Sequence, residues 1–113
     1  MRKEDIFAAI CGRAIPVKVR TVDGGEIVLR VRELSSGELA DLRELKLTDR
    51  ERMHATVAAC TVDDSGARLF DPEDVARLPH TAVDVLSEAF LDVHGLRKNA
   101  VEDAEKNSET TGS

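Results

Sequence analysis

The chain has few aromatic residues and no long apolar run, and both shortages narrow what it can be. It contains no Trp or Tyr and only three Phe, so its core must consist mainly of Val, Leu, Ile and Ala. No segment approaches the ~18 consecutive apolar residues of a membrane-spanning helix. The opening MRKEDIFAAICG is too short and too acidic for a secretory signal. We therefore expect no membrane partner.

Cysteine is scarce as well. Cys11 and Cys60 lie far apart in the sequence, and each has apolar neighbours. An unpaired Cys behaves as a small hydrophobic residue and is usually buried. We expect both thiols to be reduced and buried, as is usual in a cytosolic protein.

Basic residues are outnumbered, with 16 Lys and Arg against 22 Asp and Glu, for a net charge of −6. Binding to a nucleic-acid backbone needs a concentrated basic face, so we expect no nucleic acid as partner. The 113 residues are 42% hydrophobic and 34% charged, which is typical of a single folded domain. We expect that domain to span residues 1–98, followed by a C-terminal helix and frayed polar tail at 99–113.

A β-hairpin is predicted at about 16–32, because apolar residues alternate there with polar ones. The inward candidates are Val17, Val19, Ile27, Leu29 and Val31. A two-residue Gly24-Gly25 loop would place the two rows on opposite faces. A three-residue loop, Asp23-Gly24-Gly25, would gather them on one face, with Val17 opposite Val31 and Val19 opposite Leu29. We predict the three-residue loop, with Gly25 as its left-handed residue.

Helices are predicted over about 35–96, where the period changes and capping signals recur. Ser35 and Glu38, and again Thr48 and Glu51, have capping-box spacing. Asp71-Pro72 is a typical helix start, and a turn is expected at 63–66.

The strongest predicted helix covers 80–94, with a buried stripe of Val83, Leu86, Phe90 and Val93 and a C-cap at Gly95. A short helix or ordered lead-in at 1–12 would place Ile6, Phe7 and Ile10 on one side. The predicted fold is α+β and mostly helical, with an N-terminal β-hairpin packed on a bundle of four to five α-helices.

No enzyme signature appears. His54, His80 and His94 lie on separate elements without metal-ligand spacing. The DDSG run at 63–66 lacks the distal Glu of a calcium loop, and a plain turn explains it. Cys60 has no activating cation beside it in the sequence and is best explained by core packing. We expect a non-enzymatic protein without cofactor or metal.

The C-terminal stretch from Asn99 to Glu109 is predicted to form a helix that buries little. Asn99 and Glu102 have capping spacing, while Ala100, Val101 and Ala104 are its only apolar residues. So short a helix is marginal in water unless it docks. We therefore predict a partner-binding strip, although a solvated chain end explains the same pattern. The strip consists of Val101, Glu102, Ala104, Glu105 and Asn107.

The order of these elements resembles the tail assembly chaperone family of long-tailed (siphovirus-type) bacteriophages and their prophages. The resemblance runs from about residue 14 through nearly all of the remaining chain. Its most specific parts are VDDSGARLF, from Val62 to Phe70, and the closing GL…VEDAEKNSE. It is a resemblance of pattern and order, since neither part is a catalytic fingerprint.

The resemblance implies a small, mostly helical, non-enzymatic protein of the host cell cytoplasm. Such chaperones bind and solubilise the tape measure protein, help recruit tail tube subunits around it, and are not part of the finished virion. Many members also have a longer form, made by programmed ribosomal frameshifting, whose extra domain binds the tail tube (major tail) protein. Sheathing a filament-like partner would also favour a homo-oligomer.

The residues leave a second class of protein open. A small acidic inhibitor or adaptor would bind a host or phage protein through charge complementarity. Such a protein would need its acidic residues on one face, whereas Arg and Lys are interspersed through nearly every predicted element.

Overall fold

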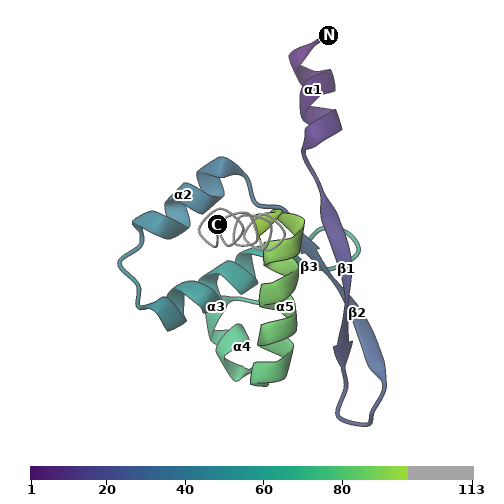
Figure 1. The fold of residues 1–113 in the computed structure, drawn as a ribbon, viewed down its shortest axis with the longest axis vertical. Coiled ribbons are helices and arrows are strands. Elements are labelled where there is room, and N and C mark those ends of the chain that lie inside the picture. Colours follow the sequence, from purple (N-terminus) through teal and green to yellow (C-terminus); the bar gives the residue numbers. More distant parts are fainter. Residues whose placement is uncertain (97–113) are drawn as a thin grey trace, which may run out of the picture.

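The structure is a computed structural model, and it describes residues 1–96. The predicted α+β, mostly helical fold is confirmed (Figure 1). In chain order the elements are α1 (Lys3–Ile10), β1 (Ala14–Arg20), β2 (Glu26–Arg32), α2 (Ser36–Glu44), α3 (Asp49–Cys60), β3 (Thr61–Val62), α4 (Pro72–Arg77) and α5 (His80–Val93). The predicted C-terminal helix at 99–109, and the binding strip on it, lie outside the described residues.

The hairpin forms, but its predicted register was wrong by two residues. Val17 lies opposite Leu29 and Val19 opposite Ile27, instead of opposite Val31 and Leu29. A shift of two preserves the alternation of side chains between the two faces of a sheet. The apolar rows therefore still share one face, as predicted.

The turn explains the shift. The loop has three residues as expected, but they are Val22, Asp23 and Gly24, and the Thr21 N–H donates to the Gly25 carbonyl at 2.9 Å. Gly24, at φ +88°, is the left-handed residue in place of Gly25. The Asp23 side chain accepts a bond of 3.2 Å from the Gly25 N–H and another from the Thr21 hydroxyl, which fixes the turn one residue earlier than predicted.

A third strand extends the hairpin and was not predicted. Val62 pairs with Arg30 and Thr61 with Val31, so the antiparallel sheet has the order β1-β2-β3. The turn predicted at 63–66 follows it, with Gly66 at φ +87°. Asp63 Oδ1 accepts from the N–H groups of Ser65 and Ala67, at 2.8 and 3.1 Å. These bonds, together with the Ser65 hydroxyl, lower the pKa of Asp63.

The core lies between the sheet and the helices. α5 packs against β1 and β2 on one side and against α3 on the other, and α3 in turn packs against α4 (Figure 1). One cluster contains the buried apolar side chains, namely Val17, Val19, Val31, Leu34, Val57, Ala58, Ala59, Cys60, Val75, Ala82, Val83, Leu86, Ala89 and Val93. Phe90, predicted to be buried, is half-buried at the edge of this cluster.

The capping signals predicted three helix starts correctly. Ser35 and Glu38 exchange bonds of 2.9 and 3.1 Å, and Thr48 and Glu51 exchange bonds of 3.1 and 3.2 Å. Asp71 caps α4 in the same way. Within residues 1–96, no helix has the length and apolarity needed to cross a membrane.

The first helix stands apart from the rest of the described structure. α1 has no buried residue, and Figure 1 shows it projecting beyond the end of β1. Cys11 follows α1 and is exposed, so the prediction that both thiols are buried was wrong for Cys11. It was correct for Cys60, where burial raises the pKa of the thiol to about 11. Apolar neighbours in the sequence do not bury a residue when its whole helix lacks a packing partner.

Candidate protein-binding groove

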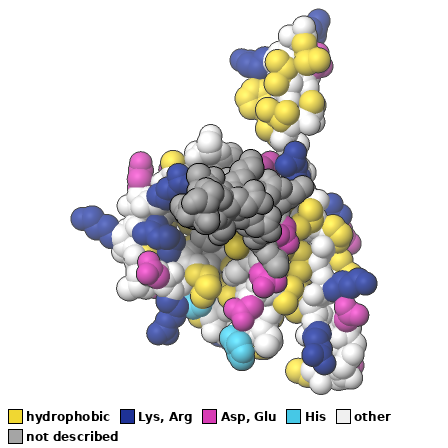
Figure 2. Space-filling model, in the orientation of Figure 1, with side chains coloured by type: hydrophobic (Ala, Val, Ile, Leu, Met, Phe, Trp, Pro, Cys, Tyr) yellow, Lys and Arg dark blue, Asp and Glu magenta, His cyan; other side chains and the backbone are white. Residues whose placement is uncertain are grey.

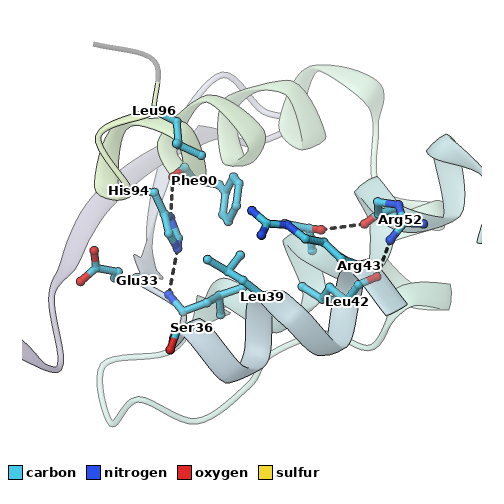
Figure 3. A pocket seen from close by; sticks show the side chains of 11 residues that line it. Glu33, Ser36, Leu39, Leu42, Arg43, Arg52, Phe90, His94 and Leu96 are labelled. Atoms are coloured by element: carbon cyan, nitrogen blue, oxygen red, sulfur yellow. Dashed lines mark hydrogen bonds between the residues drawn. The ribbon is translucent and has the colours of Figure 1, made fainter. Parts of the chain in front are cut away.

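A hollow with a volume of about 500 Å³ lies between α2, α3 and α5 (Figure 3). We call it the α2–α3–α5 groove. It is lined by Glu33, Leu34, Ser36, Leu39, Leu42, Arg43, Arg52, Thr56, Phe90, His94 and Leu96. Its apolar surface comes from Leu34, Leu39, Leu42, Phe90 and Leu96. An apolar lining with a few polar groups is typical of ligand-binding sites.

The apolar wall exists because α2 is not sunk into the core. α2 has no buried residue, and its apolar residues Leu39 and Leu42 are half-buried beside Phe90. An amphipathic helix normally buries its apolar stripe. Within residues 1–96 the stripe is only partly covered, which leaves room for a second apolar surface.

Polar contacts, rather than packing, hold the start of α2 in place. Glu38 accepts bonds of 3.0 and 2.5 Å from the two terminal nitrogens of Arg32, and also caps the Ser35 N–H at 2.9 Å. The Arg32 guanidinium is the largest influence on the carboxyl, and with the Ser35 N–H it lowers the pKa of Glu38 to about 2. A bidentate pair of this kind fixes direction as well as distance. It therefore fixes how α2 leaves β2.

His94 closes the same end of the groove. Its Nδ1 lies 2.8 Å from the Phe90 carbonyl, and its Nε2 accepts the Leu34 N–H at 2.9 Å. A ring that donates through Nδ1 and accepts through Nε2 is neutral. His94 thus joins the end of α5 to the segment before α2, and its ring lies against Phe90 with centroids 4.2 Å apart (Figure 3).

Arg52 holds the far end of α2. From α3 its guanidinium donates to the Leu42 carbonyl and, at 3.1 Å, to the Leu45 carbonyl. These carbonyls belong to the last turn of α2, which has no helical partners for them. With both ends of α2 held by side chains, the groove has a defined width although α2 contributes little to the core.

A second apolar pocket adjoins the groove. It has a volume of about 320 Å³ and lies between α3 and α5, where Met53, Val57 and Leu91 line it. Arg52, Thr56 and Phe90 line both hollows, so the two are adjacent. The Ser87 hydroxyl also lines this pocket and has no hydrogen-bond partner among the described residues. A docked polypeptide could therefore extend from one hollow into the other.

Sequence reasoning did not find this site. The predicted strip of Val101, Glu102, Ala104, Glu105 and Asn107 lies outside the described residues, so it stays a prediction. The groove is built from segments up to 63 positions apart, and the sequence signal for it is the pair Leu39 and Leu42 on an otherwise polar helix. Across residues 1–96, no three His, Cys, Asp or Glu side chains come together as metal ligands would.

No protein-family model, curated protein or solved structure matches this chain. The resemblance to tail assembly chaperones therefore stays a prediction that depends on the sequence motifs.

Proposed function

We propose that this protein is a tail assembly chaperone of a long-tailed bacteriophage or prophage, which binds and solubilises the tape measure protein in the host cell cytoplasm. The observation that carries the proposal is the α2–α3–α5 groove, whose apolar wall of Leu39, Leu42 and Phe90 is open on a folded, acidic protein. The sequence motifs supply the identity of the partner. Contact with the tail tube protein, through a frameshifted longer form, belongs to the same proposal.

The groove suits a helical client. An amphipathic helix docks by placing apolar residues at i, i+3 and i+4 into a hydrophobic groove. The groove and the adjoining α3–α5 pocket together offer about 500 and 320 Å³, enough for several such side chains. A tape measure protein is long and rich in apolar helix, so many copies of a weakly binding cover would keep it soluble. The net charge of −6 would keep coated complexes apart.

The C-terminal strip belongs to the same proposal. Leu96, the last described residue, lines the groove, which supports a role for the strip there. We propose that Val101, Glu102, Ala104, Glu105 and Asn107 add contacts to a client that already occupies the groove. Deleting residues 99–113 should then leave the thermal stability nearly unchanged and abolish co-purification with the tape measure protein. Unimpaired co-purification of the deletion variant would exclude the strip from binding, but would leave the groove proposal intact.

The main test is co-expression with a tape measure protein encoded in the same tail gene cluster. We expect the tape measure protein to stay soluble and to co-purify with the wild type. Leu42→Glu should reduce co-purification about tenfold or more, because it places a charge in the apolar wall. Val22→Glu, at the fully exposed hairpin tip, is the matched control. Circular dichroism should show that both variants are folded. A tape measure protein that is equally soluble alone, or full binding by the folded Leu42→Glu variant, would overturn the proposal.

A further inference from the structure

α1 is an apolar helix without a partner in the described part of its own chain. Ile6, Phe7 and Ile10 lie at helical spacing on one side and are 43%, 56% and 64% exposed. Figure 2 shows hydrophobic surface gathered on the projecting helix α1, which we call the arm. Helices of about eight residues are marginal in water unless they pack against something. Docking would bury the exposed apolar side chains of the arm and would stabilise its short helix.

The arm is attached beside the groove. The Glu33 N–H donates to the Arg13 carbonyl at 2.7 Å, which places the base of the arm next to Glu33, a residue of the groove rim. Cys11 is extended, and Gly12 at φ +89° follows it. From this base α1 continues beyond β1 and away from the body (Figure 1). The chain would have to reverse at Gly12 to reach its own groove, whereas the groove of a second molecule needs no reversal.

We propose that α1 of one copy lies in the α2–α3–α5 groove of a second copy. Both surfaces are apolar, so docking would bring Ile6, Phe7 and Ile10 against a wall formed by Leu39, Leu42 and Phe90. Such exchange of an N-terminal element is a common route to self-association. The groove has a volume of about 500 Å³, and α1 is the only described helix without a buried or half-buried side chain.

Charge sets the direction in which the arm lies. Glu4, in the first turn of α1, and Arg43, on the groove rim in the last turn of α2, each lack a hydrogen bond or ion pair within residues 1–96. Pairing them runs the arm antiparallel to α2, which also opposes the two helix dipoles. Arg2 and Lys3 lie at the same end of the arm and reduce the net attraction. The pair therefore determines orientation, while the apolar contacts supply the affinity.

This orientation places Cys11 near Ser36, at the opposite end of the groove, and allows a direct test. We mix the wild type with a Cys11→Ser/Ser36→Cys variant under mild oxidation. Both proteins keep Cys60, but it is buried. A disulfide between the two proteins therefore joins Cys11 of the wild type to position 36 of the variant. The matched control replaces Ser36→Cys by Asp64→Cys, in the exposed turn after β3. We expect a cross-linked dimer with the first variant and little with the second. Equal cross-linking to both positions, or a dominant disulfide between two Cys11 residues, would overturn the proposal.

Sedimentation of the protein alone gives an independent readout. The wild type should self-associate reversibly, and Phe7→Asp should weaken association about tenfold or more, since the variant can no longer bury an apolar ring. Val22→Asp, which changes an even more exposed apolar residue away from α1, should not. Neither variant touches the core, so both should keep the wild-type melting temperature. A wild type that is monomeric throughout, or a Phe7→Asp variant that associates equally, would overturn the proposal. No client protein is present, so the outcome is separate from that of the proposed function.

Discussion

At the scale of single residues, the groove is held by a few polar side chains that each bridge two segments. Glu38 joins β2 to α2, His94 joins α5 to the segment before α2, and Arg52 joins α3 to the end of α2. Each bridge adds a hydrogen bond to a backbone group at a helix end or in the linking segment. Substituting them should therefore change the shape of the groove more than it changes the core.

Glu38→Gln tests the contribution of the Arg32–Glu38 pair through the pH dependence of stability. The substitution keeps the size of the side chain and removes the charge that pairs with Arg32. The Arg32 and Glu38 side chains are 28% and 38% exposed, so solvent screens the pair and we expect a loss of about 1 kcal/mol in the free energy of unfolding at pH 7. The folded-state pKa of about 2 lies below the ordinary 4.5. The charge therefore stabilises the fold fully above pH 4.5, and this contribution is lost as the pH falls toward 2.

Urea unfolding of the wild type and of Glu38→Gln at pH 7, 4 and 2.5 measures the difference in their free energies of unfolding, which we call the gap. We expect the gap to narrow at pH 4 and to fall to about a quarter of its pH 7 value at pH 2.5. Glu44→Gln, at the exposed end of α2, serves as the control and should show no gap at any pH. A gap for Glu38→Gln that persists unchanged at pH 2.5 would mean that the carboxylate is not the source of the stability.

At the scale of elements, the sequence predicted what is local and missed what is distant. The cap residues Ser35, Thr48 and Asp71 act within one turn, so their spacing alone located three helices. The period-two pattern predicted which side chains share a face of the sheet. It did not determine the register, because a shift of two residues leaves every side chain on the same face. β3 is only two residues long and depends on pairing with β2 residues 30 and 32 positions earlier, which no local pattern indicates.

The groove and the arm were missed for a related reason. Periodicity shows that Leu39 and Leu42, or Ile6 and Ile10, share a helix side, but it does not show whether another element covers that side. In both cases none of the described elements does so fully. An apolar stripe in a sequence therefore predicts a surface that is more stable when covered. Only the three-dimensional structure shows whether another part of the same molecule covers it.

Gly24 tests the corrected turn. Because Gly24 has φ +88°, Gly24→Ala should cost about 1–2 kcal/mol, the penalty of a Cβ in the left-handed region. Gly24→Asn should cost less, since Asn tolerates this region better. Gly25→Ala would bring a Cβ to 3.2 Å from the Thr21 hydroxyl, which is a movable side chain, so a smaller loss is expected. Thermal unfolding of the three variants gives the order, and a larger loss for Gly25→Ala would favour the turn first predicted from the sequence.

At the scale of the whole molecule, the arm and the client are proposed for the same groove. A protein that carries an open apolar groove and an exposed apolar helix risks unspecific aggregation. Exchange of arms between copies would cover both surfaces while no client is present. A client that binds the groove would then displace the arm of the other copy, because the groove holds only one of them at a time.

This competition can be measured with an apolar helical segment of the tape measure protein. Adding it in excess should convert the self-associated wild type into complexes that contain a single copy. The apparent Kd of the wild type should rise with its own concentration, because the arms of other copies compete for the groove. The Phe7→Asp variant has a weakened competitor and should bind the segment with a lower Kd that does not depend on protein concentration. Titration calorimetry at two protein concentrations, with Val22→Asp as the control, separates these cases. If the segment binds while self-association is unchanged, the client and the arm occupy different surfaces.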